Sequence, residues 1–549
     1  MKCEKWRALK IDFKAKRAIS EIQEAEADVT FTHKATGKKI SIPAFWDGKC
    51  DWAVRAALTE TGEWNYLVFC KDDTLGLDGI NGTVECVPYS GEYEIYRRGF
   101  IKTEPDKRYF VYDDGTPFFY LGDTHWAMLD EEFDSPGPHA ADIKCDSHFK
   151  YIVDKRVEQR FNVYQSEPIN HRYNLNDGID DNDVEEFKRV DRYFEYIADR
   201  GMVHANAQFI FPSEITERYF NDKAFLRSIS RYWIARFSAY PVLWTLGQEV
   251  DRSYFGNNGI TPENNPYKDI CRYLYEFDPY KHPITAHQEN AMLAGALGGS
   301  KASDLAWGDY VHTSGKSTFY GMKEHTWWGV QWRPDMARQH NYAIPKDYWF
   351  NGENKVSINY ETRYDYLYTK HFGARANGWI SFLCGMYGYG YGAADMWAYL
   401  NKYSLDIPST DGLVTVTPEE KHTPWGESIK FVTGDQMTYM RDFFESLEWW
   451  KLIPDFDLGK AFVCANDEEV FHSAAYDGNK TYVVYFYNLT AKTDSKLVNM
   501  EGKYTAKWFN PVTGEYTLIS DSIVPENGEW NVPEKAADRD AVLLVTKNA

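Results

Sequence analysis

The sequence predicts an α/β protein, a (β/α)8 TIM barrel flanked by an N-terminal and a C-terminal β-sandwich domain. Three observations lead to this prediction. The 549 residues are too many for one hydrophobic core, so several domains are expected. Both ends of the chain consist of short alternating runs typical of strands, whereas the middle alternates short apolar runs with segments of helical period. The predicted domains cover residues 1–98, 99–456 and 457–549.

The first domain is predicted from strand-like runs that Gly, Asp and Asn turns separate. Residues 28–33 alternate polar with apolar side chains, and residues 66–70 form a short run of strand-forming residues. Segments 45–48 and 61–64 contain Gly and separate these runs. A small β-sandwich is the architecture that this pattern favours.

The βα alternation of the barrel is clearest in the middle of the chain. A helix is predicted over 183–200, where apolar residues recur on one face, and a strand over 202–208. The pattern repeats with a helix over 222–240, which Pro241 stops, and a strand over 242–246. Repeated strand and helix pairs of this kind predict a parallel barrel.

Eight barrel strands are predicted in one stretch of about 280 residues, which is the usual size of such a barrel. A long Trp-rich insertion over 324–354 is predicted between the sixth and seventh strands, where it should roof or wall the site. The strands are predicted to begin near Phe118, Val163, Met202, Val242, Ile284, Tyr310, Lys355 and Gly378.

The last domain is predicted to follow a helical segment over 437–452. Residues 481–487, 504–508 and 541–545 read as strands, and 510–514 reads as a turn. A second β-sandwich is the expected result.

Composition narrows the choice of partners. Acidic residues outnumber basic ones 82 to 61, for a formal charge of -21, which disfavours nucleic acid and polyanionic substrates as partners. Aromatic residues make up 17% of the chain, with 19 Trp and 40 Tyr. Their flat apolar faces and polar edges suit neutral sugars as well as protein cores. We therefore expect an oligosaccharide or glycoside as the partner.

Cysteine usage and the N-terminus bear on cofactors and location. The eight cysteines lack short paired spacing, so neither a disulfide framework nor a zinc site is expected, and no cofactor is predicted. The first residues lack the apolar core of a secretory signal, and no run of about 18 apolar residues occurs. We expect a cytoplasmic protein without a membrane partner, or a secreted one if a leader has been removed. Sandwich domains beside a barrel also favour assembly into a homo-oligomer.

Two carboxylates follow predicted barrel strands, where the catalytic groups of this fold sit. Glu249 ends the fourth strand and Glu361 ends the seventh, so they should face each other across the barrel. Glycosidic cleavage needs one carboxyl group to protonate the leaving oxygen and a second to attack or to activate water. At a separation of about 5 to 5.5 Å the second carboxylate attacks carbon and the configuration is retained. We therefore predict a retaining glycoside hydrolase, with Glu249 as general acid/base and Glu361 as nucleophile.

Other polar and aromatic residues at predicted strand ends are predicted to bind the substrate. The alternative for Asp123 is a helix cap, and for His125 and Trp126 it is packing. For the Gly- and Tyr-rich segment around Tyr389, the alternative to sugar binding is a flexible loop without a binding role. The predicted substrate-binding residues are Asp123, His125, Trp126, Gln165, Gln208, Gln248, His287, His312, Tyr360 and Tyr389.

Several of these motifs resemble those of the apiosidase-like glycoside hydrolases, whose barrel was long catalogued as a domain of unknown function. The first strand, Phe-Phe-Tyr-Leu-Gly-Asp-Thr-His-Trp, is similar to the Phe-Phe-Leu-Gly-Asp-Thr-Ala-Trp of that family. The flanking domains resemble its DUF5060 sandwich and its collagen-binding-type sandwich, so the resemblance covers nearly the whole chain. The motifs that carry it lie at residues 118–126, 160–163, 242–249, 359–364 and 388–392.

The resemblance implies the acid/base role for Glu249 and the nucleophile role for Glu361. Three positions depart from the family pattern: Glu249 stands where many relatives have Asp, Gln248 where they have Gly, and His125 where they have Ala. The extra methylene of Glu249 moves its carboxyl group by about one bond length, which changes the substrate that is positioned well. Apiose specificity is therefore not carried over, and a plant- or microbe-derived oligosaccharide or glycoside is expected.

Two other functions remain open from the sequence. A non-catalytic carbohydrate-binding protein would share the fold, but the presence of both carboxylates argues against it. A metal-dependent barrel hydrolase would need a His-x-His pair after the first strand, where this chain has Asp123 and His125. No His-Glu-x-x-His occurs either, so no metal is expected.

Overall fold

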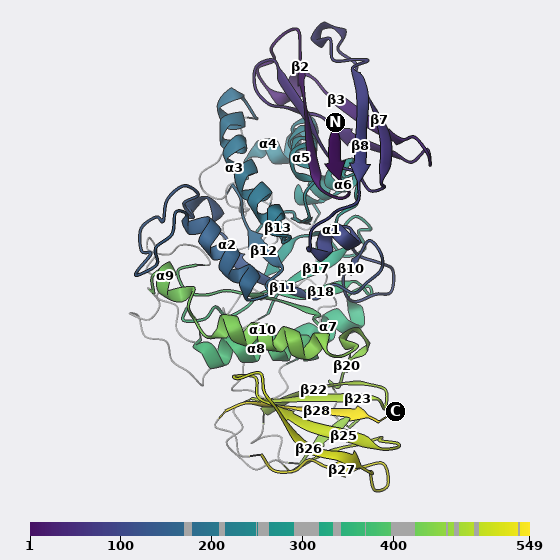
Figure 1. The fold of residues 1–549 in the computed structure, drawn as a ribbon, viewed down its shortest axis with the longest axis vertical. Coiled ribbons are helices and arrows are strands. Elements are labelled where there is room, and N and C mark those ends of the chain that lie inside the picture. Colours follow the sequence, from purple (N-terminus) through teal and green to yellow (C-terminus); the bar gives the residue numbers. More distant parts are fainter. Residues whose placement is uncertain are drawn as a thin grey trace.

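The computed structural model shows three units along one long axis, with the N-terminal sheets at one end, the barrel in the middle and the C-terminal sheets at the other end (Figure 1). None of the helices within the described ranges combines the length and the apolar composition needed to cross a bilayer. The structure describes residues 1–169, 178–207, 215–248, 250, 263–289, 318–332, 342–367, 369–396, 423–456, 459–465, 471–487, 494–535 and 539–548.

The N-terminal unit is a sandwich of two sheets, as the alternating pattern predicts. In β7 the side chains of Trp64, Tyr66 and Val68 are buried and their neighbours are exposed, because successive strand residues point to opposite faces. One sheet has the order β1 (Lys2–Glu4), β8 (Asn81–Val87), β7 (Gly62–Cys70), β3 (Ala27–His33), β4 (Lys39–Pro43), and the other has the order β2 (Ala8–Lys14), β6 (Asp51–Ala57), β5 (Phe45–Trp46).

The central unit is an eight-stranded parallel barrel. Its fifth strand is split at Ala286 into β15, which pairs with β14, and β16, which pairs with β17, and these pairings close the ring. The TIM barrel predicted from the sequence is confirmed. Its strands are β11 (Tyr120–His125), β12 (Val163–Ser166), β13 (Val203–Ala207), β14 (Val242–Thr245), β15 (Ile284–Thr285), β16 (His287–Glu289), β17 (Trp327–Gln331), β18 (Val356–Glu361) and β19 (Gly388–Tyr391).

Helices cover the outside of the barrel, and in three of those described a side-chain cap fixes the first residue. At the start of α3 the Asp180 carboxylate accepts from the backbone N–H groups of Asn182 and Asp183, and the Asp183 carboxylate accepts from the N–H of Asp180. The helices are α1 (Glu94–Arg98), α2 (His148–Glu158), α3 (Asp181–Asp199), α4 (Glu217–Asn221), α5 (Lys223–Phe237), α6 (Tyr267–Phe277), α7 (Ala343–Asn351), α8 (His371–Leu383), α9 (Trp425–Ser428) and α10 (Thr433–Glu445).

The predicted eighth strand near Gly378 is wrong, because Gly378 lies inside α8 and the eighth strand is β19. Residues 372–383 are all buried, since α8 is enclosed between the barrel and the C-terminal sheets (Figure 1). Trp379 stacks on Tyr485 of the C-terminal domain, with 5.6 Å between ring centroids. A helix buried all round has the same apolar run as a buried strand, so periodicity does not separate the two.

The predicted Trp-rich insertion is also corrected, because it contains the strand β17 and the helix α7. The predicted sixth strand near Tyr310 lies outside the described residues. Trp327 of β17 packs inside the barrel, with ring centroids 5.3 Å from Phe110 and 5.6 Å from Tyr360. This part of the Trp-rich segment therefore fills the barrel core and does not roof it.

The C-terminal unit is a second antiparallel sandwich. Its strands at 481–487, 504–509 and 541–547 match the three predicted from the sequence. One sheet has the order β20 (Ile453–Pro454), β22 (Phe471–Asp477), β23 (Thr481–Tyr487), β28 (Ala541–Lys547), β25 (Tyr504–Phe509), β26 (Tyr516–Ile523), and the other has the order β21 (Phe462–Cys464), β24 (Ser495–Leu497), β27 (Trp530–Asn531).

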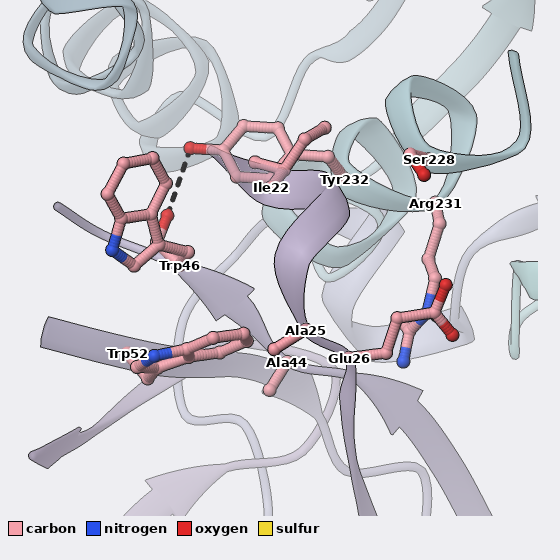
Figure 2. Close-up of a pocket in the computed structure, with 9 residues that line it drawn as sticks. All are labelled: Ile22, Ala25, Glu26, Ala44, Trp46, Trp52, Ser228, Arg231 and Tyr232. Atoms are coloured by element: carbon pink, nitrogen blue, oxygen red, sulfur yellow. Dashed lines mark hydrogen bonds and ion pairs between the residues drawn. The ribbon is translucent and has the colours of Figure 1, made fainter. Parts of the chain in front are cut away.

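A small cavity lies where the N-terminal sandwich meets α5. Figure 2 shows the rings of Trp46 and Trp52 on one side, with Tyr232 and Arg231 of α5 opposite, and the Tyr232 hydroxyl donates to the carbonyl of Trp46 over 3.1 Å. The cavity measures about 20 Å³, which is room for about one water molecule. It is therefore part of the domain junction and too small for a sugar.

Candidate active site

The carboxyl ends of the parallel strands form one rim of the barrel, and Glu361 ends β18 at this rim. Its carboxylate is buried, with 4% of the residue exposed. Glu361 Oε2 lies 2.8 Å from Nε2 of His287 on β16 and accepts a hydrogen bond of 3.3 Å from the side-chain amide of Gln248, which follows β14. Three strands thus bring a carboxylate, an imidazole and an amide together.

An aromatic wall adjoins this group. The ring centroid of Trp126 lies 5.7 Å from that of His287 and 5.7 Å from that of Tyr360. The Trp126 indole N–H donates to the Tyr364 hydroxyl over 2.9 Å, which fixes the orientation of the indole. The Tyr360 hydroxyl lies 3.1 Å from the Thr245 hydroxyl, and burial raises the pKa of Tyr360, so it stays neutral.

Asp123 and His125 belong to a separate buried network. His125 Nε2 lies 2.9 Å from Asp123 Oδ2, and His125 Nδ1 lies 2.6 Å from Glu131 Oε1. Arg156 of α2 donates to Asp123 over 2.5 Å, and the Tyr164 hydroxyl donates to Glu131 over 2.9 Å. Burial opposes protonation of His125, but the charges of Glu131 and Asp123 outweigh it and raise its pKa to about 9. His125 is therefore an imidazolium at neutral pH.

Strand alternation explains why this network lies apart from Glu361. On β11 the Tyr120 and Thr124 side chains bond Gln165 inside the barrel, whereas Asp123 bonds α2 on the helix side. His125 is two residues from Asp123 and shares its face. The structure therefore places both residues at the predicted end of the strand but not with the carboxylate of Glu361.

Gln165 and Tyr389 are bonded within the scaffold. The Gln165 amide accepts from Tyr120 over 2.8 Å and donates to the carbonyl of Tyr360 over 2.8 Å, so it ties β11, β12 and β18 together. A Cβ at Gly390 would lie 2.4 Å from that carbonyl, so only glycine fits there. The Tyr389 hydroxyl donates outward to the carbonyl of Ala374 on α8 over 3.0 Å.

The model of the apiosidase-like catalytic domain matches residues 104–451, which is more than half of the chain. This chain belongs to the apiosidase-like family. It is therefore a glycoside hydrolase, and the rim of the barrel that holds Glu361 is the place where we expect its chemistry. Two further models match the flanking domains of this apiosidase-like enzyme: DUF5060 at residues 2–71, and one described provisionally as a collagen-binding domain of a collagenase at residues 453–546.

Solved structures share the fold of this apiosidase-like enzyme at low identity. A protein of Bacteroides vulgatus ATCC 8482, described provisionally as a glycoside hydrolase, is 15% identical with a TM-score of 0.66, and the match covers 100% of both chains. A family 5 glycoside hydrolase of the same organism is 16% identical with a TM-score of 0.59, over 83% of this chain and 95% of that one. A third, described as a glycoside hydrolase, is 16% identical with a TM-score of 0.57, over 83% and 99%. No curated protein matches the chain.

Three predicted site residues, Gln208, Glu249 and His312, lie outside the described residues of the apiosidase-like barrel. Within the described part of the chain, no group of three or more His, Cys, Asp or Glu side chains is arranged to hold a metal ion. The rim also holds a residue that the sequence analysis did not single out. Gln331 ends β17 beside Glu361, and a correct assignment of the sixth strand would have identified it.

Asp395 is a second residue that the sequence analysis missed. It follows β19 by four residues, is fully buried and adopts a left-handed backbone with φ of 54°. Neither of its carboxylate oxygens has a hydrogen-bond partner among the residues described. Burial alone raises the pKa of Asp395 to about 7 from an ordinary value of 3.8.

Replacing Asp395 by Asn is expected to stabilise the apiosidase-like enzyme at alkaline pH. Because the folded pKa is raised, the folded protein holds a proton that the unfolded chain has released between about pH 4 and pH 7, so wild-type stability falls over this range. The uncharged amide lacks this dependence. Thermal unfolding should show a higher Tm for Asp395→Asn than for wild type at pH 8 and little difference at pH 4. The exposed Asp146→Asn serves as control, and equal Tm values for Asp395→Asn and wild type at pH 8 would contradict the assignment.

Proposed function

We propose that this apiosidase-like enzyme cleaves a glycosidic bond with retention of configuration, with Glu361 as nucleophile and Glu249 as general acid/base. The observation that carries the proposal is the environment of Glu361, a buried carboxylate at the barrel rim within 2.8 Å of His287 Nε2 and 3.3 Å of the Gln248 amide. Hydrogen bonds donated to a carboxylate favour its ionised form, which is the form that attacks carbon.

In the first step Glu361 forms a bond to the anomeric carbon as the bond from that carbon to the leaving oxygen breaks. Glu249 gives its proton to the leaving oxygen, which departs as an alcohol. In the second step Glu249 takes a proton from water, and the water oxygen displaces Glu361 from the anomeric carbon. Two inversions give net retention, and both carboxyl groups return to their starting states.

The role of Glu249 rests on its place in the sequence. Glu249 directly follows Gln248, whose side chain reaches Glu361, so the chain carries a second carboxyl group next in sequence to a residue that bonds the proposed nucleophile. The resemblance of residues 242–249 to the acid-bearing strand of the family supports the same role. A carboxylate next to a second carboxylate is also how one group is kept protonated as the acid.

We propose that the substrate is a neutral oligosaccharide or glycoside. The net charge of -21 disfavours polyanions, and the buried rings of Trp126, His287 and Tyr360 pack together beside Glu361, a kind of surrounding that suits a neutral sugar. Gln248, with Gln208 and His312 as further candidates from the sequence, would bond sugar hydroxyls. Asp123, His125, Gln165 and Tyr389 would support the site through the scaffold bonds described above.

A leaving-group series tests the acid role. Glu249→Ala should lose most activity on aryl glycosides with poor leaving groups and retain more on those with good ones, because only poor leaving groups need protonation. Added azide should restore turnover by replacing the water that Glu249 would activate. Initial rates on 4-nitrophenyl and phenyl pyranosides and furanosides give the comparison. An equal loss on all leaving groups, without azide rescue, would remove Glu249 from the role of acid.

A further inference from the structure

The end of β17 is held against the end of β18 beside Glu361. The register slips between Val330 and Gln331, so that Gln331 pairs with Glu361 on one side and with Glu289 of β16 on the other. Such an irregularity re-aims a side chain and is common beside active sites. The Asn359 side chain fixes the geometry, because it accepts from the N–H of Trp332 over 3.2 Å and donates to the carbonyl of Trp332 over 3.0 Å.

The side chain of Gln331 continues the interior face of β17. Trp327 packs among rings inside the barrel, and a Cβ at Gly329 would lie 3.3 Å from Thr285 and 3.5 Å from Tyr360, both of which line the interior. The next residue on this face is Gln331, one level nearer the rim. Gln331 is only 3% exposed, so its amide is enclosed at the rim.

Two buried amide atoms beside Glu361 have no hydrogen-bond partner within the described part of the chain. One is a donor, Nε2 of Gln331, and the other is an acceptor, Oε1 of Gln248. Leaving a buried polar atom unpaired is costly, so such atoms in a native protein call for a ligand or an ordered water. The Nε2 atom of Gln248 is already used, because it donates to Glu361.

We propose that Gln331 and Gln248 together recognise one hydroxyl group of the sugar, on the ring carbon next to the anomeric carbon. A hydroxyl both donates and accepts, so it can accept from Gln331 and donate to Gln248. Gln248 also bonds the carboxylate that attacks the anomeric carbon, and this places the recognised hydroxyl on the neighbouring carbon. The inference rests on the proposed role of Glu361 and makes Gln331 a specificity-determining residue for glycosides with a free hydroxyl at that position.

The test measures coupling between Gln331 and the hydroxyl. Wild type and Gln331→Met are compared on the 4-nitrophenyl glycoside that wild type cleaves fastest and on its analogue that lacks the hydroxyl next to the anomeric carbon. We expect Gln331→Met to lower kcat/KM about tenfold on the parent glycoside and less than about twofold on the deoxy analogue. Gln331→Leu, which also removes the donor and adds no charge beside Glu361, should show the same selective loss if the Met variant folds poorly.

Controls separate this inference from the proposed function. Gln23→Met removes another partnerless amide nitrogen, in the N-terminal domain, and should leave both rates unchanged. The same two ligands titrated calorimetrically into Glu361→Gln, with and without Gln331→Met, give the coupling in Kd without turnover. Equal losses on both ligands in an enzyme that cleaves the parent would overturn the role of Gln331 alone. If wild type cleaves neither ligand, but Gln331→Met still weakens binding of the parent ligand more than binding of the deoxy ligand, the proposed function would be overturned and the role of Gln331 would stand.

Discussion

Replacement of Glu361 by glutamine is expected to lower kcat/KM by about 10⁴-fold or more while leaving the Tm nearly unchanged. Glutamine keeps the size of the side chain and its place beside His287 and Gln248 but has no charge with which to attack carbon. Initial rates on the best aryl glycoside and thermal unfolding of the same samples measure both quantities. The exposed Glu276→Gln, on α6 of the same barrel, is the matched control for the chemical change.

The outcome separates a catalytic from a scaffold role for Glu361. A scaffold role would lower activity and Tm together, because the fraction of folded enzyme would fall. A catalytic role lowers the rate of a fully folded enzyme. Activity of Glu361→Gln within about tenfold of wild type, at equal Tm, would remove Glu361 from the role of nucleophile.

Replacement of His125 by alanine is expected to destabilise the barrel by about 3 to 5 kcal/mol, since it removes the cation between two buried carboxylates. Asp123 would keep Arg156 as a partner, but Glu131 would lose its closest cation. Urea unfolding followed by Trp fluorescence at pH 7 measures the effect. Adding Glu131→Gln to His125→Ala should recover part of the loss, because the second change removes the uncompensated charge.

The pH dependence of this effect has a definite sign. The folded pKa of His125 is raised to about 9 from 6.5, so its contribution to stability is fully present below about pH 6.5 and is lost as the pH rises through 9. The difference in stability between wild type and His125→Ala should therefore shrink between pH 6.5 and pH 9.5. A difference that stays constant over this range would show that His125 acts through packing and not through its charge.

The fold was predictable because its elements carry strong local signals. The helix α3 has a capping box and an apolar face, and α5 begins after the cap Asp222 and ends at Phe237, four residues before Pro241. The two failures share one cause. The helix α8 is buried on all sides and β17 is rich in Trp. The hydrophobic pattern of such a segment does not distinguish a helix from a strand, because its secondary structure depends on the elements packed around it.

The site was predictable as far as strand ends could be located. Glu361 ends β18, Gln248 follows β14 and His287 lies on β16, and the structure brings these three side chains together. Asp123 and His125 also end a strand but lie on its helix-facing side. The two-residue alternation of a strand shows which side chains share a face. Only the packing of the neighbouring elements decides which of the two faces is interior. Gln331 was missed because its strand was misplaced.

The stereochemistry of the first-formed product tests the central claim most directly. Proton NMR during hydrolysis of the best aryl glycoside distinguishes the two anomers of the released sugar before they equilibrate. Double displacement through Glu361 predicts that the sugar appears first with the same anomeric configuration as the substrate. Release of the opposite anomer would mean that water attacks the anomeric carbon directly, and Glu361 would then not be the nucleophile.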